Sequence, residues 1–206
     1  QIGAIVGSQP FGGEGLSGTG PKAGGPNYVK RFTLSEKNEW VKPNLDNSIS
    51  LNIVQVAINK IKNNKKRLES HKLPGPTGES NVLSFYSRGV VLCLGPTFDM
   101  ALLQAQTAKE TGCSTLIITE DAEGESTIKG SLNRADLQFL NGFDAVVAWS
   151  DEEDQRDILR ALASRSGPII PLINDLNFSD RCILERHLCI DTTAAGGNAA
   201  LLMKTS

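Results

Sequence analysis

Short, continuous apolar runs recur through the second half of the chain and predict the strands of a parallel sheet. The runs cover residues 90–94, 115–119, 144–149 and 168–173. Strands buried on both faces have this pattern, because helices cover both sides of a parallel sheet. Between the runs, apolar residues return at helical spacing, at Phe98, Ala101, Leu102, Ala105 and Ala108, and again at Ile158, Leu159 and Leu162. The alternation predicts an α/β fold, a Rossmann-like parallel sheet with flanking helices and right-handed crossovers.

Weaker patterns predict the elements on either side of this sheet. A helix is expected from residue 51, with Ser48 or Ser50 as its N-cap and an apolar face formed by Leu51, Val54, Ile58, Ile61 and Leu68. A short strand over 81–86 and a short helix over 135–140 follow. Residues 186–191 and 199–203 form two strand patterns around a small-residue stretch, which predicts a C-terminal β-hairpin that docks closely against another backbone.

The most unusual stretch lies near the N-terminus, at residues 9–26. It is dense in glycine and is interrupted by Pro10, Pro21 and Pro26, so neither a helix nor a central strand tolerates it. It contains the spacing GxGxxG at 13–18, which is typical of dinucleotide sites when a helix follows directly. Residues 19–26 cannot begin such a helix, because they hold further glycines and prolines. We interpret the stretch as a shaped Gly-rich extension whose backbone approaches another surface closely.

Composition and charge narrow the function classes. The chain has 206 residues and a formal charge of −2, which favours neither nucleic acid nor a membrane surface as a partner. We find no signal-peptide pattern and no apolar run of about 20 residues, and we expect a cytoplasmic protein. A start at Gln1 without methionine is expected of a piece of a longer protein. The cysteines Cys93, Cys113, Cys182 and Cys189 are widely spaced, so we expect buried reduced thiols and no disulfide framework or metal site.

A basic cluster, Lys60, Lys62, Lys65, Lys66 and Arg67, allows two interpretations. It could bind nucleic acid, or it could complement the dipole at the C-terminus of the predicted helix. Aromatic residues that would stack on bases are not interleaved with these charges. We therefore favour the helix interpretation and expect no nucleic-acid contact through this region.

The sequence offers few residues that could form a nucleophilic, metal-binding or nucleotide-binding site. The two histidines, His71 and His187, lie in no nucleophile-elbow context, and a metal site would need more clustered ligands. The first predicted strand of the sheet, 90–94, is followed by a single glycine, Gly95. The dinucleotide fingerprint has three glycines at this place. The sequence thus predicts no catalytic, cofactor-binding or metal-binding residue in this chain, and a Rossmann-like domain without a nucleotide.

Three separated motifs carry a family resemblance. Residues 9–26, 73–79 and 192–200, in this order, resemble the C-terminal region of the bacterial proline utilization A family, in its long form with an added aldehyde-dehydrogenase-superfamily domain. Enzymes of this family oxidise proline to glutamate. They join an FAD-dependent proline dehydrogenase and an NAD-dependent L-glutamate γ-semialdehyde dehydrogenase in one polypeptide.

The resemblance implies a division of the chain. Residues 1–32 would end the semialdehyde dehydrogenase domain, 33–50 would form a linker, 51–185 the Rossmann-like lid domain, and 186–206 the docking hairpin. In the parent enzyme, the main-chain N–H groups of Gly3 and Ala4 would hold the substrate carboxylate, and Phe11 would line the aldehyde chain. Without the domain that it serves, this segment should leave Phe11 and Phe32 with nothing to bury against.

The function that the resemblance implies is non-catalytic. This region would cover the tunnel between the two active sites and support the semialdehyde dehydrogenase site, with the catalytic domains of its own parent chain as partners. FAD and NAD would bind elsewhere in the parent, so this fragment alone should be inactive. A homo-oligomeric parent is expected, and its peripheral membrane association stays open. The alternatives are a stand-alone dinucleotide-binding domain and a regulatory nucleic-acid-binding module.

Overall fold

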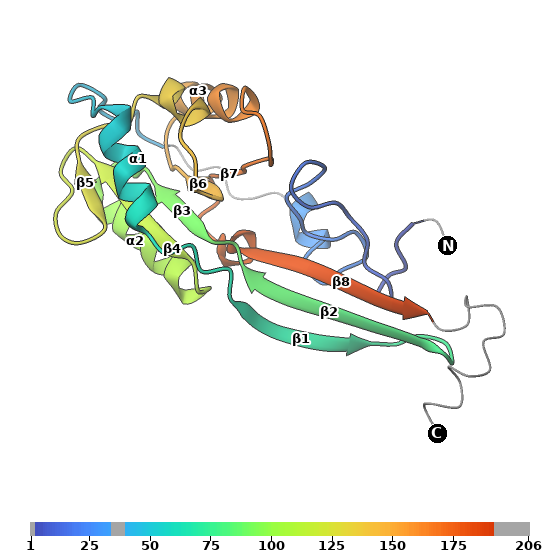
Figure 1. Cartoon of the computed structure of the whole chain (residues 1–206). Coiled ribbons are helices and arrows are strands. Elements are labelled where there is room, and N and C mark those ends of the chain that lie inside the picture. The colour runs from blue at the N-terminus through green and yellow to red at the C-terminus, as the bar shows by residue number, and fades with distance from the viewer. Residues whose placement is uncertain (1–2, 34–39, 192–206) are drawn as a thin grey trace.

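An α/β lobe and a three-stranded arm make up the computed structural model, which describes residues 3–33 and 40–191 (Figure 1). The lobe contains a parallel sheet with the strand order β5-β4-β3-β6-β7. Its strands are β3 (Val90–Cys93), β4 (Ser114–Thr119), β5 (Thr127–Lys129), β6 (Ala145–Val147) and β7 (Leu172–Ile173). The predicted α/β class with a parallel sheet is confirmed.

Helices cover both faces of this sheet. On one face, α1 (Leu51–Lys60) and α3 (Glu152–Ala163) pack against residues such as Leu92, Leu116 and Val146. On the other face, α2 (Phe98–Glu110) and the 3₁₀ helix η3 (Ser179–Cys182) pack against the alternate strand positions. Successive strand side chains point to opposite faces, so the continuous apolar runs supply both cores.

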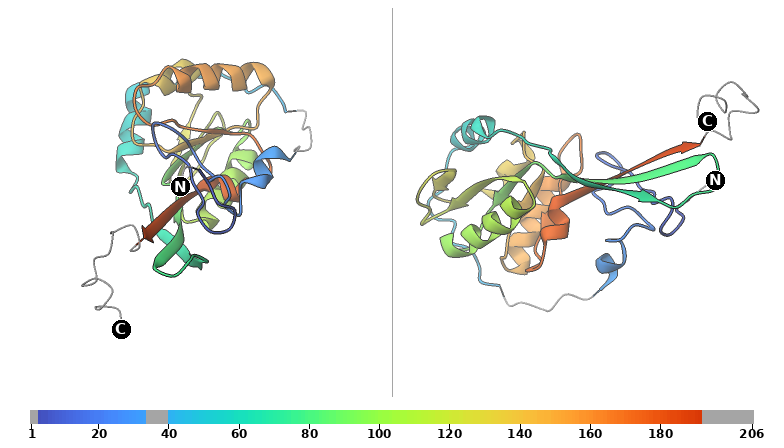
Figure 2. Two further views of the ribbon diagram at one scale, coloured as in Figure 1. Left: turned by 90° about the vertical axis from the view of Figure 1, so that its right-hand side faces the viewer. Right: turned by 90° about the horizontal axis from the view of Figure 1, so that it is seen from below.

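The arm is an antiparallel sheet with the order β1-β2-β8 (Figure 2). It consists of β1 (Arg67–Leu73), β2 (Glu79–Ser87) and β8 (Ile183–Asp191). The central strand β2 pairs with β8 along its whole length, from Glu79 opposite Asp191 to Ser87 opposite Ile183. Every second residue of β2 is buried, from Asn81 onward. One face of the arm is therefore covered, and the N-terminal segment covers it.

The predicted first helix is too long. α1 ends at Lys60, and Leu68 lies in the strand β1 instead of on the helical face. Of the basic cluster, Lys60 alone lies in the last helical turn, so the dipole argument does not apply to the other four residues. Ser50 is the N-cap, although its side chain makes no capping hydrogen bond.

Other elements differ from their predicted limits. The short helix expected at 135–140 is the 3₁₀ helix η2 (Arg134–Gln138), and the strand expected at 168–173 is only β7. The expected division at residue 186 falls inside β8, which begins at Ile183. The second strand of the predicted C-terminal hairpin, at 199–203, lies outside the described residues. The division into domains stays a prediction.

The expected linker contacts the lobe through its described residues 40–50. Trp40 stacks on Trp149, with ring centroids 5.5 Å apart and planes 8° apart. Farther along, Ile49 N–H donates to the Ser131 carbonyl at 2.9 Å. In the N-terminal segment, the 3₁₀ helix η1 (Val29–Phe32) carries Phe32, which is exposed, as is Phe11. Among the described residues, no helix is long and apolar enough to cross a membrane.

Candidate functional site

The residues expected to contact substrate in the parent lie in the N-terminal loop, which we define as residues 3–26. Gly3 has a φ of +116°, a conformation that side chains disfavour, and both Gly3 and Ala4 are exposed. Phe11 is 66% exposed, and its main chain forms two hydrogen bonds with Ala23, of 3.0 and 2.8 Å. The Ala4 side chain lies beside Gly24. The structure thus places Gly3, Ala4 and Phe11 on one loop, all of them exposed, and their contact with substrate in the parent stays a prediction.

A buried carboxylate anchors this loop to the arm. Glu185 of β8 is only 4% exposed, and its carboxylate accepts hydrogen bonds from the main-chain N–H of Lys22 at 2.7 Å and from Asn27 Nδ2 at 2.8 Å. Gly25 leaves room for this approach, since a Cβ there would lie 3.1 Å from a Glu185 oxygen. A buried carboxylate needs such donors, and a glycine-rich loop has main-chain N–H groups to offer.

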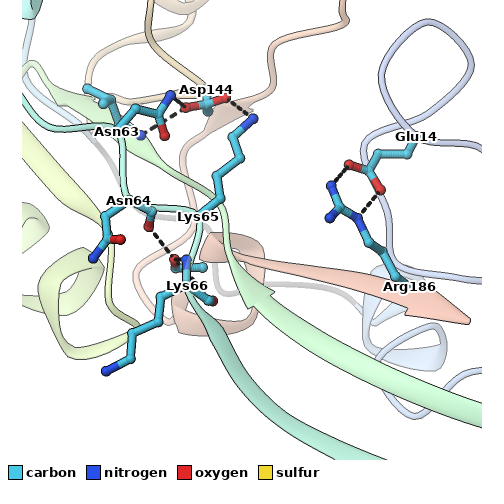
Figure 3. Close-up of polar contacts among 9 residues, drawn as sticks. Glu14, Asn63, Asn64, Lys65, Lys66, Asp144 and Arg186 are labelled. Carbon is cyan, nitrogen blue, oxygen red and sulfur yellow. Dashed lines mark hydrogen bonds and ion pairs between the residues drawn. The ribbon is translucent and has the colours of Figure 1, made fainter.

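The next residue of β8 holds the loop from the opposite face. Arg186 forms a bidentate ion pair with Glu14, at 2.8 and 2.6 Å (Figure 3). Its guanidinium also lies 4.8 Å from the Tyr86 ring centroid. The hydrogen bonds from Arg186 hold the pKa of Glu14 below its usual value. Neighbouring residues of a strand point to opposite faces of the sheet. The loop is therefore bound to one face of β8 through Glu185 and to the other face through Arg186.

The tip of the loop reaches the far end of the arm. Gln9 Nε2 donates to Glu79 Oε1 at 2.7 Å, and Ser8 Oγ donates to the Pro74 carbonyl at 2.6 Å. Between loop and arm runs a groove of about 720 Å³. Its walls include Pro10 and Gly24 from the loop and Leu73, Leu83 and Phe85 from the arm.

The position where a Rossmann-like sheet would bind a nucleotide is filled by the chain itself. The strand order reverses between β3 and β6, and ligands of such sheets bind at the carboxyl ends of these strands. There the fully buried Gln104 donates to the Gly95 carbonyl at 2.9 Å and accepts from the Gly95 N–H at 3.2 Å. The Gly95 carbonyl also accepts from Trp149 N–H.

The start of α2 offers few free donors to a pyrophosphate. Thr97 caps the helix by accepting from Met100 N–H, and Phe98 N–H donates to Asp121 at 3.1 Å. A Cβ at Gly95 would lie 2.8 Å from Thr97 N, so the turn is tight. Main-chain donors that normally hold phosphate are engaged with the chain's own side chains.

We expect that NAD does not bind to the isolated chain, because Gln104 and Trp149 fill the switch point. Calorimetric titration with NAD should give no saturable heat up to millimolar concentration. A Gln104→Ala variant should open some space without restoring binding, since the Phe98 and Met100 donors stay engaged. Micromolar binding to the unaltered chain would refute this and revive the dinucleotide-binding alternative.

The basic cluster is partly engaged with the chain. Lys65 pairs with Asp144 at 2.8 Å, and Asn63 donates to the same carboxylate (Figure 3). Arg67 donates to Ser70 Oγ at 2.8 Å. These contacts use charges that a nucleic-acid site would present to phosphates. The absence of a nucleic-acid partner stays a prediction.

The titratable groups form no catalytic arrangement within residues 3–33 and 40–191. His71 is exposed and pairs with Glu69 at 3.2 Å, whereas burial lowers the pKa of His187. Cys93, Cys113 and Cys182 are buried free thiols, as expected, and burial raises the pKa of Cys93. Cys189 is exposed, so its expected burial was wrong: it lies near the outer end of β8, where Gln9 Nε2 approaches its Sγ at 3.7 Å without burying it. The described part of the chain holds no cluster of metal ligands.

Sequence patterns could not identify Glu14, Glu185 and Arg186 as the anchors of the loop. The partners Lys22 and Glu185 are 163 positions apart, so local periodicity carries no signal for them. The one available hint was a charged pair, Glu185 and Arg186, at the start of a predicted strand.

No protein-family model matches the chain. The bifunctional protein PutA of Escherichia coli K12 is 32% identical over 240 residues, which cover 98% of this chain and 18% of that protein. PutA of Rhizobium meliloti is 31% identical, covering 98% and 19%. A crystal structure of proline utilization A from Bradyrhizobium japonicum is 29% identical over 51% of this chain and 13% of that one, with a TM-score of 0.40. The chain spans about a fifth of the length of these curated relatives.

Proposed function

Since this chain matches the C-terminal region of the bifunctional PutA proteins, we propose that it is the non-catalytic part of such an enzyme. In this role it covers the channelling tunnel and supports the semialdehyde dehydrogenase site. The parent would oxidise proline to glutamate with FAD and NAD bound outside this region. Its partners would be the parent's own catalytic domains, in a cytoplasmic homo-oligomer.

One observation carries the supporting role. The loop that would hold the substrate is bound to β8 by Glu185 on one face and Arg186 on the other. Its position therefore depends on an arm that is anchored in the lobe. In the parent, the N–H groups of Gly3 and Ala4 would bind the substrate carboxylate, and Phe11 would contact the aldehyde chain. These three residues have no catalytic group of their own, so the chain alone would oxidise neither proline nor aldehyde.

The arrangement of the switch point supports a non-catalytic lobe. At the switch point, the Gly95 carbonyl already accepts hydrogen bonds from the side chain of Gln104 and the main-chain N–H of Trp149. Fold alone would not assign an activity to such a sheet. A lobe of this kind can serve as a rigid body that carries the arm.

The test uses the full-length parent enzyme. Truncation after Asp191 should weaken coupled proline-to-glutamate turnover and lengthen the lag before NADH appears with proline as substrate, because the intermediate escapes. Proline dehydrogenase activity, measured with an artificial electron acceptor, should survive. Arg160→Gln on the exposed surface of α3 is a control that should change neither quantity.

Two results separate this proposal from its competitors. If the truncated enzyme shows no lag and oxidises added semialdehyde normally, the lid role is wrong. Salt-dependent binding of the isolated chain to DNA would instead favour the nucleic-acid alternative.

A further inference from the structure

A second cavity, of about 280 Å³, lies where the N-terminal loop, the lobe and the base of the arm meet. It is at the amino-terminal side of β3 and β6, opposite the filled switch point, because Asp144 directly precedes β6. Figure 3 shows two of its walls, with Glu14 on one side and Asn63, Lys65 and Asp144 on the other. Nothing in the proposed lid role uses this cavity.

The two acidic groups that line the cavity are already neutralised. Asp144 accepts from Lys65 at 2.8 Å, from Asn63 Nδ2 at 3.1 Å and from the Val90 N–H at 2.9 Å. The other carboxylate, Glu14, is paired with Arg186, as described above. A cation entering the cavity would thus have to compete with strong existing partners.

The arginine at the base of the cavity has no such compensation. Arg88 is only 5% exposed, and its hydrogen bonds all go to main-chain carbonyls: Nε to Arg181 at 2.6 Å, Nη2 to Thr19 at 2.9 Å and Nη2 to Ile183 at 3.5 Å. Within the described residues, no carboxylate forms an ion pair with it. Burial lowers the pKa of Arg88, and the nearby Arg31 and Arg181 charges lower it further. Burying a cation without a counter-charge is costly.

A second arginine, Arg165, lines the same cavity and is partly buried. Arg165 donates from Nη1 to the carbonyls of Leu137 and Leu140, and its guanidinium lies 4.9 Å from the Phe143 ring centroid. Its buried Nε has no hydrogen-bond partner among the described residues. Burial lowers the pKa of Arg165 as well. Two arginines without counter-ions thus border one small cavity.

We propose that this cavity binds a small anionic metabolite through a carboxylate or phosphate group held between Arg88 and Arg165, with Lys65 at the rim. Guanidinium forks match the oxygen geometry of both groups. The volume of about 280 Å³ lies just below the usual range of drug-sized sites, roughly 300–1,000 Å³, so it fits a small acid and not a dinucleotide. The bound anion would join the loop, through Thr19 and Arg88, to the lobe.

The experiment titrates the purified chain with two probes, inorganic phosphate and succinate, by calorimetry and by thermal unfolding. Sodium chloride at equal ionic strength is the reference for unspecific screening. We expect saturable binding and a rise in the unfolding temperature for at least one probe. The probe that binds more tightly tells whether the site prefers phosphate or carboxylate.

Variants locate the binding in this cavity. Arg165→Gln should weaken binding about tenfold or more, because it removes a guanidinium that would contact the anion. Lys65→Gln should weaken binding about threefold, because it removes a cation at the rim and leaves the Asp144 carboxylate without that partner. Arg160→Gln, three-quarters exposed on α3, removes the same charge and should leave the affinity unchanged. Arg165 is preferred to Arg88, whose three carbonyl contacts make it a risk for folding. No saturable binding of either probe above chloride, or equal affinities of the Arg165→Gln and Arg160→Gln variants, would overturn the proposal.

Discussion

Replacing Asp154 with asparagine is expected to lower the free energy of unfolding of the lobe by about 3–5 kcal/mol, the usual cost of breaking a buried ion pair. Asp154 and Arg134 are almost completely buried, with side chains 4% and 6% exposed. They form a bidentate contact of 2.8 and 3.2 Å. An asparagine would leave the Arg134 charge buried and would set an N–H₂ donor against a second donor. This contact joins η2 to α3, and Arg165 adds hydrogen bonds to the carbonyls of Leu137 and Leu140.

Urea unfolding at neutral pH measures this loss, provided the slope of the transition is unchanged. The matched control is Glu152→Gln on the same helix, because its pair with Arg156 is 2.9 Å long but largely exposed. That change should cost less than about 0.5 kcal/mol. A double replacement, Arg134→Met with Asp154→Leu, should recover most of the stability, since no charge stays buried. If the Asp154 and Glu152 variants were equally stable, the buried pair would not hold η2 to α3.

Glu185→Ala is expected to release the N-terminal loop from the arm while the lobe stays folded. Hydrogen bonds to a charged acceptor contribute about 1.5–3 kcal/mol each, and Glu185 accepts two. The amide protons of Phe11 and Ala23, which bond across the loop, should therefore exchange about 100-fold faster or more. Amide protons within β4 should keep their protection, because the parallel sheet does not depend on the loop.

Arg186→Gln is the matched control for this second prediction. It breaks the contact with Glu14, whose pair is much more exposed, and should change exchange by less than about tenfold. In a parent enzyme, the Glu185 variant should also raise the KM for semialdehyde, if the loop holds the substrate carboxylate. Unchanged protection of Phe11 and Ala23 in Glu185→Ala would show that the loop is held in some other way.

The lobe was predictable because its determinants are local. The run at 90–94 is apolar throughout, the run at 115–119 is apolar at its three central positions, and they form β3 and β4 nearly residue for residue. α2 begins at Phe98, directly after its cap Thr97, as its spacing indicated. In each case a few adjacent residues contain the whole signal.

The arm was less predictable because pairing far along the chain stabilises it. β1 has a mostly exposed sequence without clean alternation, and Leu68 continues a helical spacing by coincidence. It becomes a strand because β2 pairs with it from Arg67 opposite Tyr86 to Leu73 opposite Asn81. Tertiary context overrides such weak local preferences. The loop anchors and the Arg88 cavity escaped prediction for the same reason, since they join segments that no local window contains.

The distance along the chain between the loop and its anchor also bears on biosynthesis. Lys22 leaves the ribosome 163 residues before Glu185, and β2 likewise waits for β8 as its second neighbour. At roughly 5–20 residues per second, this interval lasts on the order of ten to thirty seconds. During that time the nascent glycine-rich segment lacks β8, which carries its anchors Glu185 and Arg186, whereas β3, β4 and α2 can already pack together. The lobe is therefore completed before the loop reaches its anchors on β8.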